Sequence, residues 1–226
     1  MSGNRQVALT RGQYWLLEAV TEYRIGVAGL SDEDYYTEAL NRSSHGLSLD
    51  ELTDTFTAFL CDGLLKLTTG ESNDAVDVSG LDIRALILSK NRDWRTREFW
   101  YGLTTSGGAL WESFAQPRWE CYMPDTGCAL PDETNRYLSR FTALHEGTID
   151  LHLMYLNQWL VSLGKSPSEV ISRSRVEPWE ATYWKTFETG CQVEVRIPEV
   201  ADDLHDWGTY PTALSHKFNE WYTMHM

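Results

Sequence analysis

The chain has 226 residues and a net charge of −14, and so acidic a molecule repels nucleic-acid phosphates and anionic membrane surfaces. Its hydrophobic fraction of 42% and aromatic fraction of 12% exclude wholesale disorder and predict a packed core. No apolar run has the length of a membrane span, and no apolar signal core opens the chain, so we expect a cytoplasmic protein. Its oligomeric state is left open.

The four cysteines form no C-x-x-C pair, and reduced thiols are the default in a cytoplasmic protein. They are Cys61, Cys121, Cys128 and Cys191. Cys61 falls among the apolar residues of a predicted helix, so we expect it to pack as a small hydrophobic side chain.

Three helices are predicted in the first 62 residues from the spacing of apolar side chains. They cover residues 11–24, 32–41 and 49–62. The third has the clearest boundaries, because Ser48 and Glu51 match the S-x-x-E capping box and a glycine follows its end. A strand is predicted next at 64–68, then a polar loop at 70–80, and then a short helix at 81–90, with a strand as the alternative.

Residues 98–115 predict a strand that runs straight into a helix. Phe99, Tyr101 and Leu103 fall on one face of the strand, and Thr104 offers a hydroxyl to the free N–H groups of the next turn. The apolar face of the following helix consists of Leu110, Trp111 and Phe114.

Tyr101, Leu103, Thr104 and Gly107 match the pattern Y-x-L-T-x-x-G, which ends the second wing strand in many bacterial winged-helix proteins. With the predicted order of helices and strands, residues 10–116 resemble a winged-helix domain. The alternative is an unrelated α+β arrangement with the same strand-to-helix turn. The resemblance implies a DNA-binding third helix and wing contacts to the phosphate backbone.

The sequence departs from this implied function at the third helix. That helix has no Lys or Arg between Leu49 and Cys61, and its carboxylates are Asp50, Glu51, Asp54 and, at its end, Asp62. Residues 1–116 contain ten Lys and Arg against seventeen Asp and Glu, a balance of −7. Such a helix is poorly suited to a groove lined with phosphates, so nucleic acid is not the expected partner.

One basic segment, the predicted wing, could contact nucleic acid. Lys90, Arg92, Arg95 and Arg97 surround Trp94, and cations with an aromatic ring between them can bind phosphate and stack on a base. The favoured interpretation is a solvated loop, because exposed charges usually serve only solvation.

A second domain is predicted over 117–226, which makes the whole chain α+β. Its predicted helices are at 135–144, 149–163, 166–172 and 211–222. A strand at 178–187 and an alternating strand at 191–197 predict a β-hairpin over about 179–197.

No assembled catalytic motif is present: the sequence lacks nucleotide-binding glycine motifs, a nucleophile elbow and H-E-x-x-H, and it predicts no catalytic residue, cofactor or metal. The densest set of candidate metal ligands is His145, Glu146, Asp150 and His152, although Gly147 argues against one continuous helix. A second cluster, interpreted as solvated loop charge, comprises Asp202, Asp203, His205 and Asp206.

We therefore expect a non-enzymatic protein-interaction module, which would fit an acidic immunity or inhibitor protein with a basic protein partner. One alternative is a transcription-regulator-like DNA-binding protein that uses the basic wing. The other is an enzyme with an unrecognised site, for which His145 and His152 are the candidates.

Overall fold

The computed structural model describes residues 8–32, 43–70, 72, 74–89, 99–124, 136–198 and 221–222. They form two compact units, the first containing the described residues up to Ala115 together with Thr182–Trp184, and the second containing the others. Both units combine helices with antiparallel strands, which confirms the predicted α+β class. Several predicted features lie outside the described residues. They are the helix at 32–41 apart from Asp32, the helix at 211–222 apart from Trp221 and Tyr222, the basic segment at 90–97 and the His205 cluster.

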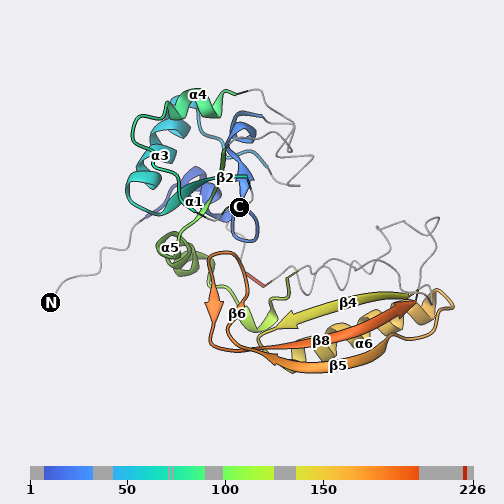
Figure 1. Cartoon of the computed structure of the whole chain (residues 1–226). Helices are drawn as coiled ribbons and strands as arrows, with labels where there is room; N and C mark the ends of the chain where they lie inside the picture. Colours follow the sequence, from blue (N-terminus) through green and yellow to red (C-terminus); the bar gives the residue numbers. More distant parts are fainter. Residues whose placement is uncertain are drawn as a thin grey trace. The chain divides into compact units, whose positions relative to one another are not determined.

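The first unit consists of helices around a small antiparallel sheet (Figure 1). Its elements are α1 (Arg11–Glu18), β1 (Ile25–Gly26), the 3-10 helix η1 (Val27–Ser31), α3 (Leu49–Cys61), β2 (Leu65–Thr69), α4 (Ile83–Ile87), β3 (Phe99–Leu103) and α5 (Thr105–Ala115). The prediction of a helix rather than a strand after residue 81 is confirmed by α4, which Asp82 caps through a hydrogen bond from the Ala85 N–H.

Helix α3 begins and ends where local hydrogen bonds predict. The Ser48 hydroxyl accepts the Glu51 N–H, and the Glu51 carboxylate accepts the Ser48 N–H, so the capping box is complete. At the other end Gly63 has φ +67°, and the Leu64 N–H donates to the Phe59 carbonyl in a Schellman motif. The predicted inward stripe is confirmed by the buried side chains Leu52, Phe56, Phe59 and Leu60.

Strand β3 lies at the centre of the first sheet, in the order β1–β3–β2. Tyr101 is opposite Ile25 of β1 on one side and Leu67 of β2 on the other. Its buried ring meets the edge of Phe56 from α3, with 5.0 Å between the ring centroids. Because the sheet and α3 contribute these rings together, the core of this unit contains residues from both.

The strand-to-helix junction after β3 is fixed by Thr104, as predicted. Its hydroxyl accepts the Gly107 N–H at 3.0 Å and donates to the Gly63 carbonyl, so that it caps α5 and joins it to the end of α3. Gly107 lies against the main chain of Leu64, where an added Cβ would be 1.9 Å from the carbonyl oxygen. Only glycine fits this position without a shift of the backbone.

Helix α1 is shorter than the predicted 11–24, because it ends at Glu18. The carbonyls of Val20 and Thr21, which would continue the helical pattern, accept hydrogen bonds from the side chains of Tyr183 and Trp184 instead. These donors are 163 positions further along the chain, so no local pattern could predict the early end.

The second unit consists of a long helix against a three-stranded antiparallel sheet (Figure 1). A separate two-stranded sheet is formed by residues that lie between the last two strands of the larger sheet in the sequence. Its elements are the 3-10 helix η2 (Trp119–Cys121), β4 (Arg136–Ala143), α6 (Glu146–Ser162), β5 (Glu169–Val176), β6 (Trp179–Glu180), β7 (Thr186–Phe187) and β8 (Gly190–Pro198). The strand order is β4–β8–β5, so the last of the described strands is the central one.

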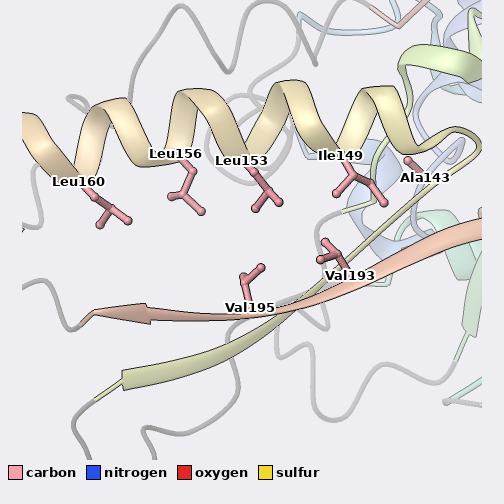
Figure 2. Close-up of a cluster of buried hydrophobic side chains, with 7 residues drawn as sticks. All are labelled: Ala143, Ile149, Leu153, Leu156, Leu160, Val193 and Val195. Carbon is pink, nitrogen blue, oxygen red and sulfur yellow. The ribbon is translucent and has the colours of Figure 1, made fainter. Parts of the chain in front are cut away.

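Helix α6 packs its apolar stripe on the inner face of this sheet. Figure 2 shows the side chains of Ile149, Leu153, Leu156 and Leu160 directed toward β8. The partners on β8 are Val193 and Val195, and all of these side chains are buried. Both the helix and the alternation along 191–197 were predicted, and both are confirmed.

The predicted helix at 135–144 is wrong, because this segment forms strand β4 against β8. Its buried side chains are Ser139 and Ala143, two small residues with little hydrophobic signal. The larger Leu138 and Phe141 have a spacing that also fits a helix, and the pairing with a distant strand decides between the two structures.

The predicted short helix at 166–172 is also wrong. Its Ser-Pro-Ser-Glu start resembles a helix N-terminus, but residues 169–176 pair with β8 as strand β5. The predicted pairing of 178–187 with 191–197 fails for the same reason, because β8 already has β4 and β5 as neighbours. Residues 179–187 instead form their own small hairpin, β6–β7.

Two further expectations are corrected. Cys61 is exposed in the last turn of α3, so it does not pack as a core side chain. Gly147 lies in the first turn of α6 and does not interrupt the helix, since the helix begins at Glu146 and has room around this glycine.

Candidate functional site

The residues suggested as nucleic-acid contacts, namely Lys90, Arg92, Trp94, Arg95 and Arg97, lie outside the described residues. The histidine and carboxylate set on α6 is described, and the helix separates its members. His145 is the exposed N-cap residue, whereas His152 is buried against the Phe141 ring at 4.6 Å between centroids. Within the described ranges, no three His, Cys, Asp or Glu side chains are placed to hold a metal ion.

Burial also changes the proton affinity of His152. Removal from water disfavours the imidazolium, and it lowers the pKa of this side chain from 6.5 to about 4. The ring is therefore neutral near pH 7 and packs as part of the core. This environment suits a structural histidine better than a proton-transfer group, which needs access to its substrate.

The carboxylates of α3 are partly engaged in structural contacts. Asp50 forms an ion pair with Arg84 of α4, and the Glu51 carboxylate closes the capping box. Hydrogen bonds from Ser48 lower the pKa of Glu51, and its main-chain N–H contributes more than its hydroxyl. Asp54 on the same helix and Asp62 at its C-cap are exposed. The exposed side of α3 is acidic, but two of its four carboxylates serve the fold itself.

A more distinctive feature of α6 and β5 is a set of large apolar side chains exposed to solvent. We call it the α6–β5 surface; its residues are Leu151, Met154 and Val161 of α6, and Val170 and Ile171 of β5. Val161 is 57% exposed, and Met154 and Val170 are each 46% exposed. Large apolar side chains exposed on neighbouring elements can form binding sites, whereas single exposed apolar residues need no explanation.

Two polar contacts place the α6 and β5 parts of this surface side by side. The Asn157 side-chain oxygen accepts the Ser168 N–H at 2.8 Å, and Arg173 forms an ion pair with Asp150 at 2.6 Å. Met154 is one helical turn from both Asp150 and Asn157, so it lies on the side of α6 that faces this seam. Val161 follows Asn157 by a further turn, and the exposed Val170 and Ile171 lie between Ser168 and Arg173 in the chain.

Among the described strands, β5 is at one edge of its sheet, and this edge is protected against pairing with another strand. A β-bulge interrupts its register between Val170 and Ser172. Arg173 lies opposite the buried Val193, so its charge is on the α6 side of the sheet, at the margin of the apolar surface. Bulges and inward-pointing charges are features that discourage strand addition. A partner is therefore expected to meet the side chains of the α6–β5 surface rather than to extend the sheet.

Sequence reasoning predicted α6 and its buried stripe but missed the exposed apolar residues. The available signal was the presence of apolar residues all around this helix, which a surface helix with one buried stripe does not need. Trp159 and Leu163 were assigned to the inward stripe and are only half-buried.

No family model, curated protein or solved structure matches this chain. Among the described residues, no helix combines the length and the apolar character that crossing a bilayer requires.

Proposed function

We propose that this protein is a non-enzymatic protein-interaction module and that its α6–β5 surface is the docking site for a protein partner. The observation that carries the proposal is the exposure of five large apolar side chains on two neighbouring elements. Covering such side chains removes apolar area from water, at about 25 cal/mol per Å². The hydrophobic effect therefore favours association at this surface.

The net charge of −14 supports a partner with a basic surface, as an acidic inhibitor or immunity protein would have. Complementary charge raises the association rate more than it raises affinity, and its effect falls with salt. We further propose that the first unit is a winged-helix-like scaffold. The sheet order β1–β3–β2 and the direct run from β3 into α5 support this architecture, whereas α4 lies between β2 and β3 where a simple wing would have only a loop. The acidic α3 argues against its use on DNA.

The test is affinity capture from extracts of cells that make the protein, with the full-length chain as bait. The double variant Met154→Lys/Val161→Lys places two cations on the α6–β5 surface and should lose partners that the wild-type chain retains. Leu88→Lys is the matched control, because Leu88 is 48% exposed on the first unit and lies outside this surface. A basic partner should also be released by raised salt.

Retention of the same partners by the Met154→Lys/Val161→Lys variant would contradict the assigned surface. The nucleic-acid alternative makes a different prediction, namely a mobility shift of duplex DNA at low salt that Arg92→Ala, Arg95→Ala and Arg97→Ala together abolish. Such a shift would replace the proposed function by DNA binding.

A further inference from the structure

The short segment Thr182–Trp184 belongs to the first unit, although its neighbours on both sides, Ala181 and Lys185, belong to the second. These three consecutive residues thus belong to the first unit, while the residues directly before and after them belong to the second. Thr182 and Trp184 are buried, and Tyr183 is partly buried. Recognition through a few adjacent side chains is typical of a peptide bound to a domain.

Tyr183 is held by main-chain groups of the first unit. Its hydroxyl accepts the Leu103 N–H at 2.7 Å and donates to the Val20 carbonyl. Strand β1 pairs with β3 only at Trp100 and Tyr101, so Leu103 lies beyond the end of β1 and the tyrosine hydroxyl takes the place of a strand partner. Burial raises the pKa of the Tyr183 hydroxyl, which keeps the proton that this donation needs.

Trp184 is recognised in the same way. Its indole N–H donates to the Thr21 carbonyl at 2.7 Å, and its ring meets the edge of Trp111 with 6.1 Å between centroids. The six-membered part of the indole lies on Gly108, where an added Cβ would be 2.1 Å from a ring carbon. Gly102 gives Tyr183 the same close approach, since a Cβ there would be 2.8 Å from the hydroxyl oxygen.

We propose that the first unit has a binding slot for a Tyr-Trp segment of a polypeptide, and that Thr182–Trp184 occupies this slot as a ligand supplied by the same chain. The slot has the parts of a peptide-binding site. Gly102 and Gly108 leave room for the two rings. Main-chain groups of Val20, Thr21 and Leu103 form hydrogen bonds with the phenol hydroxyl and the indole N–H. Each polar group selects against an analogue that lacks it, because the main-chain group would then lose its partner.

The test empties the slot in the full-length chain and offers the segment in trans. The double variant Tyr183→Gly/Trp184→Gly should bind a blocked synthetic peptide that copies residues 177–189, whereas the wild-type chain, whose slot is filled, should bind it at least about tenfold more weakly. A peptide with Tyr183→Phe should bind the emptied variant about tenfold more weakly than the natural peptide, because one hydrogen-bonding group is lost. Isothermal titration measures all three affinities.

Equal binding of the tyrosine and phenylalanine peptides, or no binding to an emptied variant that retains its circular dichroism and cooperative unfolding, would overturn the proposal. If the emptied variant does not fold, hydrogen exchange on full-length Tyr183→Phe decides. The Leu103 amide should then exchange at least about tenfold faster than in the wild-type chain, while the amide of Val193 in β8 keeps its rate. An unchanged hydrogen-exchange rate of the Leu103 amide would contradict the proposed binding slot.

Discussion

At the scale of single residues, the buried imidazole of His152 makes the stability of the second unit depend on pH. Its pKa is about 4 in the folded protein and near 6.5 when the chain is unfolded. The unfolded chain therefore binds the proton first, and the stability that neutral His152 contributes is present above pH 6.5 and is lost as the pH falls to 4. The loss is on the order of 3 kcal/mol for a shift of this size.

We predict that His152→Leu weakens this pH dependence. Urea unfolding at pH 7 and pH 4 should show a smaller fall in the free energy of unfolding for the variant than for the wild-type chain. His145→Leu, at the exposed N-cap of the same helix, is the control, and it should retain the wild-type pH dependence because the buried His152 ring stays in place. Identical differences between the two pH values in the wild-type and His152→Leu chains would contradict the prediction.

At the scale of secondary-structure elements, the packing of α5 on Leu64, the residue before β2, depends on Gly107. We predict that Gly107→Ala lowers the free energy of unfolding by about 3 kcal/mol, because the new Cβ meets the Leu64 carbonyl oxygen and forces a main-chain shift. Gly147→Ala is the matched control in the first turn of α6, where nothing lies within 4 Å of the new Cβ. It should stabilise the protein by about 0.5 kcal/mol through helix propensity.

Chemical denaturation followed by circular dichroism measures both glycine variants. Equal effects of Gly107→Ala and Gly147→Ala would show that the contact with Leu64 does not limit the junction. The contrast between the two positions matters because both glycines lie in the first turn of a helix and only one touches another element.

Elements that local contacts define could be predicted from the sequence. The capping box at Ser48 and Glu51 and the glycine at 63 give the bounds of α3, and Thr104 gives the start of α5. Strands β4 and β5 could not be predicted, because both depend on β8. Arg140 and Glu194, which pair across β4 and β8, are 54 residues apart, and no short window contains both.

The candidate site could be predicted only in part, for a related reason. The sequence identifies α6 and its apolar residues, but which of them meet the sheet depends on how far the sheet extends beneath the helix. Here β5 is the last strand on that side among the described residues, so Met154 and Val161 remain uncovered. The early end of α1 was equally inaccessible, since Tyr183 and Trp184 act from 163 positions away.

At the scale of the whole molecule, the inward charge of Arg173 should keep the protein from self-association. We predict that Arg173→Val produces larger assemblies at micromolar concentration, measured by light scattering after size exclusion, because it removes a charge from the margin of an apolar surface and a strand edge. Arg84→Val is the control, since it breaks a similar ion pair with Asp50 on the first unit and changes the net charge equally. Equal assembly of both variants would contradict the role assigned to Arg173.

The central place of β8 in the second sheet has a consequence for synthesis. The chain leaves the ribosome from its N-terminus, so β4, α6 and β5 emerge before the strand that joins them. Until residue 198 has been made, β4 and β5 lack their shared neighbour, and the apolar stripe of α6 lacks Val193 and Val195. The nascent second unit is thus most exposed to aggregation and to chaperones in the interval between the translation of α6 and that of β8.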